Sequence, residues 1–489
     1  MKKKRSGLVR QMKMLASSIA VIFTIAGCGG GGSGSGETCS VAQQTGCDAG
    51  LVCAVISTGG TGCFESMVVK GKVIRLADQA PIANARVVAL DVNGSPVSTV
   101  ATTDAAGAYE MTVYLTRLDS GAPAGDDFTL RADAAGFETF PAGLRQPLPI
   151  DSGAAVDDGT RFVVESQLTT IGLLDLPAGS GTGVIKGKAT LPDGVSGVLV
   201  VAESSPTEGF SAMTDRTGDY KIFNVPDGSY TVKGYAKGAN FTPASAAVTA
   251  GTEVTADLAA SSDATATFNG SVQIVNPGSG SATSVILVVE STFDPVLIRG
   301  EQPPGLRVPD GGIAPNVTGA FTLSGIPTGT YVVLAAFEND FLVRDPDTCI
   351  AGTDILHQAF TSGQTVDLAS GFKITGSLDV ISPGADGPET VTTTTPTFTW
   401  KDDSSEENYR LSVFDTFGNK VWETTIPGTS GTNPSVVYNA DGTGAGTATA
   451  LQSGMYYQFR AVSTKTPGGS PTPCEISQTE DLKGVFVVQ

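Results

Sequence analysis

Two hydrophobic patterns divide this chain. Residues 14–26 form one mainly apolar run, whereas the sequence beyond them contains short stretches in which apolar and polar residues alternate. Alternation with a period of two is typical of strands that bury one face, and the 61 glycines and 27 prolines supply turns between them. No long stretch with helical periodicity follows residue 27. The pattern therefore predicts an all-β protein built from many short strands.

The apolar run has the layout of a signal peptide. It is too short to cross a membrane comfortably, and the small residues Ala26 and Gly27 stand before Cys28, where a peptidase could cut. The basic residues before the run are Lys2, Lys3, Lys4, Arg5, Arg10 and Lys13. We expect residues 1–27 to be a signal peptide and the mature protein to be exported.

The tetrad at residues 25–28 resembles the lipobox of bacterial lipoproteins, with Ile25 in place of the commoner leucine. The resemblance implies that Cys28 is lipidated and that the membrane is a partner through this end of the chain. Gly29 after the cysteine implies retention in the outer membrane, on either its periplasmic or its surface face. The glycines and serines of residues 28–38 predict a flexible tether. The alternative is an ordinary secretory leader, after which Cys28 would form a disulfide.

The charge of the chain excludes one class of partner. Its formal net charge of −19 becomes −25 when the leader and its six basic residues are removed. Contacts to nucleic-acid phosphates need a basic face, so we expect no nucleic acid to bind.

Six cysteines remain after Cys28. This is an even number, as expected when all cysteines of an exported protein pair in disulfides. Four of them predict a small knot of two bridges over residues 39–63, with three connectivities open: Cys39, Cys47, Cys53 and Cys63. This segment is similar to small cysteine-rich knots with a G-C-x-x-G-x-x-C core. A zinc site is the alternative, but paired C-x2-C spacing and a nearby histidine are missing, so we expect no metal. Cys349 and Cys474 either bridge the third β-domain to the last or remain free thiols.

Three segments after the knot share two turn motifs. Thr-Asp-x-x-Gly-x-Tyr occupies residues 103–109 and 214–220, and Pro-x-Gly-x-Tyr occupies residues 226–230 and 327–331. An aspartate that accepts backbone N–H groups and a glycine with positive φ reverse the chain between two strands. The third copy is diverged, and an insertion at residues 293–315 separates its halves.

These motifs resemble the carboxypeptidase regulatory-like domain, a transthyretin-like sandwich that is also grouped with starch-binding-like folds. The resemblance implies that Asp104, Gly107, Asp215 and Gly218 are scaffold residues without a catalytic role. In the last segment, residues 396–400, 409–413 and 451–462 are similar to strands B, C and F of a fibronectin type III-like domain, and the most specific element is Leu-x-x-Gly-x-x-Tyr at residues 451–457. This resemblance implies a core position for Trp400 and a tyrosine corner at Tyr457. The expected order is signal peptide 1–27, tether 28–38, knot 39–63, sandwiches 64–178, 179–262 and 263–380, and the last domain 381–489.

Candidate chemistry is sparse. His357 is the only histidine, so multi-histidine metal sites are excluded and only one Ser-His-Asp triad is conceivable. The acidic pairs 126–127, 157–158 and 402–403 are more typical of solvated turns than of Ca²⁺ sites. We expect no enzyme activity and no cofactor, and a lipid-anchored envelope protein whose strung sandwiches act as spacer and adhesion modules. The alternative is carbohydrate binding, with Trp422 beside charged residues as the candidate; the protein or polysaccharide ligand stays open.

Overall fold

The computed structural model describes residues 39–489 except 42, 92–93, 144, 193–194, 196, 276–282, 296–298, 308–309, 311–318, 338–354, 404, 440–447, 467–471 and 481. The predicted signal peptide, Cys28, the tether and Cys349 therefore lie outside the described residues. The part of the chain that is described folds into strands with three short 3-10 helices, which confirms the all-β prediction. Within it, no helix has the length and apolar character needed to cross a bilayer. The 3-10 helices are η1 (Ser152–Ala154), η2 (Gln167–Thr169) and η3 (Glu290–Thr292).

A small hairpin comes first. Strands β1 (Leu51–Val55) and β2 (Thr61–Glu65) pair antiparallel, and Cys53 lies opposite Cys63 in their register. Arg117 fastens the hairpin to the next module, because its backbone N–H donates to the carbonyl of Val55 and its Nη2 donates to that of Glu65, both within 2.9 Å.

The first sandwich has two sheets. One is formed by β3 (Met67–Arg75), β6 (Ala108–Val113), β9 (Val156–Asp157), β10 (Phe162–Val164) and β11 (Thr170–Leu173). The other is formed by β4 (Arg86–Asp91), β5 (Ala101–Thr102), β7 (Asp127–Asp133) and β8 (Ile150–Asp151). Side chains of both sheets share one buried cluster, as in a β-sandwich. The central strand β3 pairs antiparallel with β6 and parallel with β10 and β11.

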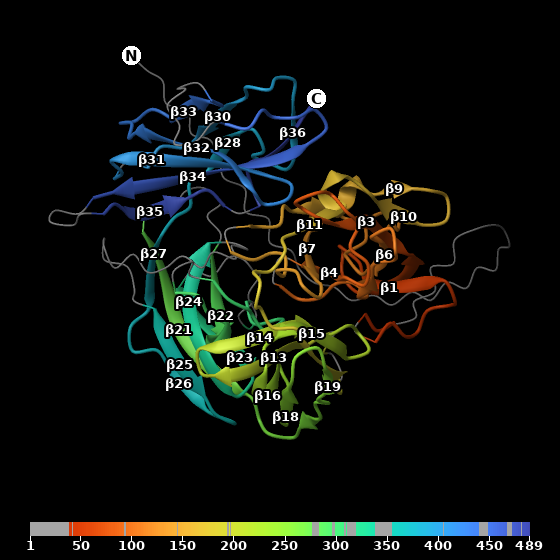
Figure 1. Cartoon of the computed structure of the whole chain (residues 1–489). Coiled ribbons are helices and arrows are strands. Elements are labelled where there is room, and N and C mark those ends of the chain that lie inside the picture. Colours follow the sequence, from red (N-terminus) through yellow and green to blue (C-terminus); the bar gives the residue numbers. More distant parts are fainter. Residues whose placement is uncertain are drawn as a thin grey trace, which may run out of the picture. The chain divides into compact units, whose positions relative to one another are not determined.

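The second sandwich repeats this layout. Its first sheet consists of β12 (Gly183–Lys188), β15 (Asp219–Val225) and β19 (Glu253–Thr255), and β12 again pairs antiparallel with one neighbour and parallel with the other. Its second sheet consists of β13 (Leu199–Ser205), β14 (Glu208–Met213), β16 (Gly228–Tyr235) and β18 (Ala244–Val248) (Figure 1). A short pair, β17 (Asn240–Phe241) and β20 (Ala260–Ser261), completes it.

The third sandwich has the same arrangement around β21 (Ala266–Val275). This strand pairs antiparallel with β23 (Gly319–Ile326) and parallel with β26 (Thr365–Asp367) and β27 (Phe372–Thr375). The facing sheet is formed by β22 (Thr283–Val289), β24 (Gly329–Phe337) and β25 (Leu356–Phe360).

The last module differs in topology. A small sheet contains β28 (Val380–Ser382), β30 (Thr397–Trp400) and β33 (Ser435–Val437). The larger sheet contains β29 (Glu389–Val391), β31 (Asn408–Asp415), β32 (Lys420–Pro427), β34 (Tyr456–Lys465), β35 (Cys474–Gln478) and β36 (Val485–Val488). Trp400 is fully buried, and the Tyr457 hydroxyl accepts a hydrogen bond of 2.9 Å from the Gln452 N–H, as the predicted tyrosine corner requires.

The first three sandwiches share a core. One buried cluster joins Val88 and Leu90 of β4, Leu199 and Val201 of β13, and the inner face of the third sandwich. Strands β4 and β13 are thus buried on both faces, which explains why their sequences are continuous apolar runs instead of alternating ones. These three modules are therefore not separate pieces on a string, because each covers apolar surface of another.

Candidate functional site

The most concentrated polar chemistry in the described residues surrounds Arg131 of β7. Its Nη1 donates to both carboxylate oxygens of Glu301, at 2.8 and 2.7 Å. Its Nε and Nη2 reach the carboxylate of Asp133 at 3.2 and 3.3 Å, and Nη2 also lies 3.2 Å from Ser211 Oγ. Because the Arg131 side chain is only 5% exposed, this is a buried ion-pair network joining three sandwiches.

The alternation of β7 positions the arginine. Phe128, Leu130 and Ala132 point into the core of the first sandwich, so Arg131 and Asp133 lie together on the opposite face. Glu301 comes from the insertion in the third repeat, and Ser211 comes from β14 of the second. Burial lowers the pKa of Arg131, but the carboxylates of Asp133 and Glu301 outweigh burial and raise it. The guanidinium is therefore permanently charged and acts as a clamp.

Further arginines join segments that are far apart in the sequence. Arg145 Nε donates to the carbonyl of Phe417 in the last module at 3.1 Å, and its guanidinium lies 4.8 Å from the ring centre of Phe140. Arg299 Nη1 donates to the carbonyl of Arg145 at 3.1 Å. Sequence reasoning missed these residues because it treated charge only as a net sum. The available signal was an arginine in the middle of an apolar strand, as at Arg131.

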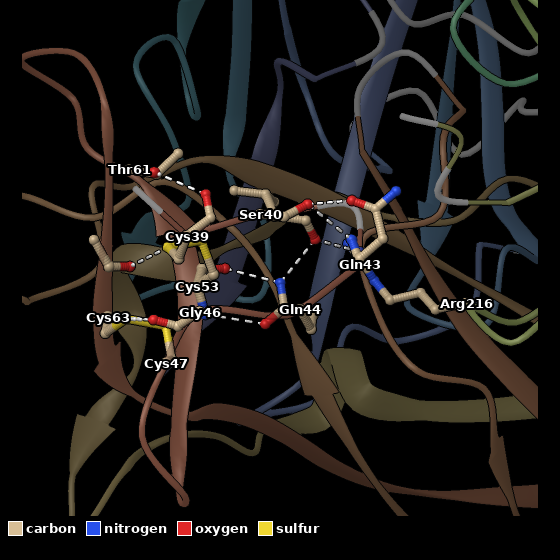
Figure 2. The surroundings of a disulfide bond; sticks show 12 residues. Cys39, Ser40, Gln43, Gln44, Gly46, Cys47, Cys53, Thr61, Cys63 and Arg216 are labelled. Carbon is tan, nitrogen blue, oxygen red and sulfur yellow. Dashed lines mark hydrogen bonds between the residues drawn. A yellow bond between two sulfur atoms is a disulfide. The ribbon is translucent and has the colours of Figure 1, made fainter. Parts of the chain in front are cut away.

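Arg216 fastens the cysteine knot to the sandwiches (Figure 2). Its Nη1 donates to the carbonyl of Val41 at 2.7 Å, and its guanidinium lies 4.1 Å from the ring centre of Tyr114. Arg216 belongs to the Thr-Asp-x-x-Gly-x-Tyr turn of the second sandwich, whereas Tyr114 belongs to the first. One side chain thus touches three parts of the fold, and burial lowers its pKa.

The knot contains the two predicted bridges, and the structure chooses their connectivity: Cys39–Cys53 and Cys47–Cys63 (Figure 2). All four sulfurs are thereby used in disulfides, which speaks against the zinc alternative. The amide of Gln44 lies beside them, where Nε2 donates to the carbonyl of Cys53 and Oε1 accepts from its N–H, at 2.9 and 3.0 Å. Cys474 is also disulfide-bonded; a pairing with Cys349 stays a prediction because Cys349 lies outside the described residues.

The turn motifs act as local scaffolds. Asp104 Oδ1 accepts from the N–H groups of Ala106 and Ala108, and Asp215 Oδ1 accepts from those of Thr217 and Asp219, all at 2.8 to 2.9 Å. The glycines of these turns, Gly107 and Gly218, have positive φ. Sequence reasoning missed a matching turn in the last module, in which Asp415 accepts from the N–H groups of Phe417 and Asn419 and Gly418 has positive φ.

The tyrosines of the second motif close their own turns. Tyr230 donates to the carbonyl of Pro226 and Tyr331 donates to that of Pro327, each at 2.9 Å. The proline and the tyrosine of Pro-x-Gly-x-Tyr are therefore partners in one hydrogen bond.

Trp422 contradicts the expected exposure. It is 3% exposed and contacts Phe398 and Tyr438 in the core of the last module. Lys420 and Glu423 form an ion pair with each other at the surface. Trp422 and Thr424 are buried and Glu423 between them is more exposed, whereas a register shift separates Lys420 from this alternation. A buried indole cannot stack on a sugar, so the carbohydrate candidate is wrong as a surface site.

The remaining sequence candidates occupy ordinary surroundings. The His357 side chain is 55% exposed, and its Nδ1 lies 2.9 Å from Glu290. Carboxylates of the three acidic pairs accept hydrogen bonds from nearby N–H groups, as at Asp126, Asp158 and Asp402. In the Asp126–Asp127 pair, burial and the carboxylates of Asp151 and Asp126 raise the pKa of Asp127 to about 6.

Comparisons with known proteins identify no family, because no family model and no curated protein matches the chain. Among solved structures, BcpA, the major pilin subunit of Bacillus cereus, is 11% identical, with 64% of this chain and 99% of that chain covered and a TM-score of 0.17. GBS52, the minor pilin of Streptococcus agalactiae, is 12% identical, with 41% and 100% covered and a TM-score of 0.19. The Bacillus anthracis TIE protein is 10% identical, with 82% and 65% covered and a TM-score of 0.14. TM-scores this low carry no argument, and the all-β fold rests on the strands themselves.

Proposed function

We propose that this protein is an exported, non-catalytic structural protein whose β-sandwich modules form a rigid interaction unit held at the cell envelope by a lipid on Cys28. The shared core of the first three sandwiches carries the proposal. Modules that bury apolar surface against one another and close the seam with Arg131, Glu301 and Asp133 keep a fixed mutual geometry. A fixed geometry is what a spacer or an adhesion module needs.

Two further observations support the exported, non-catalytic character. Structural disulfides persist in oxidising compartments, and this chain has them at Cys39–Cys53 and Cys47–Cys63. His357, the only histidine, faces solvent and is paired with Glu290. A screen of hydrolase substrates tests this part, and activity that disappears in His357→Ala would overturn it.

Lipid anchoring is tested by mass spectrometry of the membrane fraction. The expected result is an acylated N-terminal peptide that begins at Cys28. The variant Cys28→Ala should lose the acyl mass and leave the membrane fraction, whereas Cys349→Ala should keep both. A mature N-terminus without acyl mass at Cys28 would refute the anchor while leaving export intact.

Interaction is tested by a pull-down with envelope proteins and with insoluble polysaccharides in parallel. The burial of Trp422 removes the residue that suggested a sugar-binding surface, so we expect proteins to be retained instead of polysaccharides. Retention of polysaccharide alone would reverse this preference.

A further inference from the structure

A cavity of about 250 Å³ lies beside the Arg131 cluster. All three of the first sandwiches contribute to its wall, through Leu90 and Thr139 of the first, Ser211 and Met213 of the second, and Glu301 and Gln302 of the third. The cavity exists only because these modules meet, and no sequence motif points to it.

The side-chain amide of Gln302 is the unusual group in this wall. Gln302 is 8% exposed, and neither its Nε2 nor its Oε1 has a hydrogen-bond partner in the described part of the chain. A buried amide without partners destabilises a folded protein, so native structures seldom keep one without a use. A group that both donates and accepts hydrogen bonds would satisfy it.

The charges of the wall favour a neutral occupant. The charged residues that line the cavity are Arg131, Arg299, Asp294 and Glu301, so the described wall carries two positive and two negative charges. An ionic ligand would therefore find no net opposite charge among the lining residues. The hydroxyls of Thr139 and Ser211 already donate to Asp133 and Glu301, and Ser211 Oγ also accepts from Arg131. The oxygen of Thr139 and the second lone pair of Ser211 Oγ are left to accept from a ligand.

The remaining lining residues and the volume of the cavity limit the kind of ligand that it can hold. Leu90, Met213 and Pro141 offer an apolar side, and no aromatic ring is among the described lining residues. The volume lies below the usual lower limit of about 300 Å³ for ligand pockets. The occupant must be small, uncharged, rich in hydroxyl groups and equipped with a C–H face.

We propose that this cavity binds a single-ring neutral sugar or an acyclic polyol, with the Gln302 amide as its principal polar contact. The site is distinct from the surface site once suggested at Trp422, and it does not depend on the lipid anchor. Binding across three modules would also tighten their contact, since a ligand of the assembled state stabilises that state.

Thermal shift and calorimetric titration of the purified full chain test the proposal with a panel of neutral hexoses and polyols. Glucuronate and glucosamine serve as charged analogues of the same ring. We expect at least one neutral compound to raise the unfolding midpoint and both charged analogues to bind more weakly.

Three variants then locate the site. Gln302→Leu keeps the volume and removes the amide, so it should weaken binding at least about tenfold while the ligand-free midpoint stays the same or rises. Ala142→Leu should fill the cavity and block binding without touching a polar group, which keeps the test valid if Gln302→Leu misfolds. Gln452→Leu, on an exposed glutamine of the last module, should bind like the wild type.

The proposal fails if no neutral compound shifts the midpoint, which would mean that only water fills the cavity. It also fails if the charged analogues bind best, or if binding persists in both Gln302→Leu and Ala142→Leu.

Discussion

Arg131 and Glu301 are 170 residues apart in the sequence, and two hydrogen bonds of 2.8 and 2.7 Å join them in the fold. Asp133 holds the same guanidinium from its own strand. Buried ion pairs are poor sources of net stability but are costly to break, because the remaining charge loses its partner. This pair therefore fixes how the first and third sandwiches meet more than it adds to the stability of either.

Removal of one partner of the Arg131–Glu301 ion pair should destabilise the fold. We expect Glu301→Ala to lower the free energy of unfolding by about 3 kcal/mol, measured by chemical denaturation with circular dichroism. The triple variant Arg131→Met/Asp133→Asn/Glu301→Leu should lose less than Glu301→Ala, because it removes every charge of the cluster together. Glu253→Ala, which breaks exposed pairs with Lys186 and Lys221, is the matched control and should have little effect. Equal losses of unfolding free energy for Glu253→Ala and Glu301→Ala would refute a special role of the buried Arg131–Glu301 pair.

The turn glycines should be intolerant of a side chain for two separable reasons. A Cβ on Gly218 would lie 2.0 Å from the carbonyl of Ala189, and one on Gly107 would lie 2.5 Å from that of Val73. Gly238 has a similar positive φ but nothing within 4 Å of its Cβ position. We expect Gly238→Ala to cost about 1 kcal/mol from φ alone and the other two alanine variants to cost more than about 3 kcal/mol. Similar thermal midpoints for all three would show that the close approach is unimportant.

The hydroxyls of the Pro-x-Gly-x-Tyr motif can be removed one at a time. Tyr331→Phe leaves the carbonyl of Pro327 without this partner inside the core, whereas Tyr230→Phe frees the Pro226 carbonyl at a partly buried site. We expect losses of about 2 kcal/mol for Tyr331→Phe and about 1 kcal/mol for Tyr230→Phe in denaturation experiments. A larger loss at Tyr230 would contradict this ranking.

Asp127 should make stability depend on pH in a recognisable direction. Its pKa of about 6 in the folded protein exceeds the value of about 3.9 expected when unfolded, so the folded state holds the proton more tightly. Stability from this group is therefore lost as the pH rises through this window, by about 1 kcal/mol between pH 5 and pH 7. Unfolding midpoints of Asp127→Asn at both pH values should lack this loss. An identical pH profile in wild type and variant would show that Asp127 is not the titrating group.

Carboxylates whose pKa is lowered do not change the stability between pH 5 and pH 7. Glu110 and Glu301 are stabilised by Arg161 and Arg131, so their contribution is present above the unfolded pKa of about 4.3 and is lost only as the pH falls through their folded values. The pKa values of Asp415 and Glu406 are also raised, so these groups lower the stability as the pH rises, as Asp127 does. They are present in both the wild type and Asp127→Asn. The comparison with Asp127→Asn therefore isolates one carboxyl.

Local features of this fold were predictable because their causes are local. The aspartates and glycines of the repeated turns lie within a few residues of the groups they serve. The core position of Trp400 was implied by the resemblance to a fibronectin type III-like domain, and the burial of Trp400 agrees with it. The expected exposure of Trp422 rested on its charged neighbours alone and is wrong, because the register of β32 places the indole in the core. The face that a residue occupies follows from the register of its strand and not from the polarity of nearby residues.

The contact surface between the first three sandwiches could be predicted only in part. The apolar runs that become β4 and β13 lack alternation, which indicates strands covered on both faces. What covers them is not local information, since Glu301 and Gln302 reach the seam from an insertion far along the chain. The Arg131 cluster and the cavity depend on three modules meeting, and no spacing rule within one module encodes that.

The order of strands has a mechanical consequence. Each module has an early strand that runs parallel to a late one: β3 with β11, β12 with β19, β21 with β27, and β29 with β36. A pull on the beginning of the early strand and the end of the late strand draws two parallel neighbours in opposite directions along their length. Their hydrogen bonds then carry the load together, whereas the strands of a hairpin peel open one bond at a time. A chain with this strand order resists stretching between its ends.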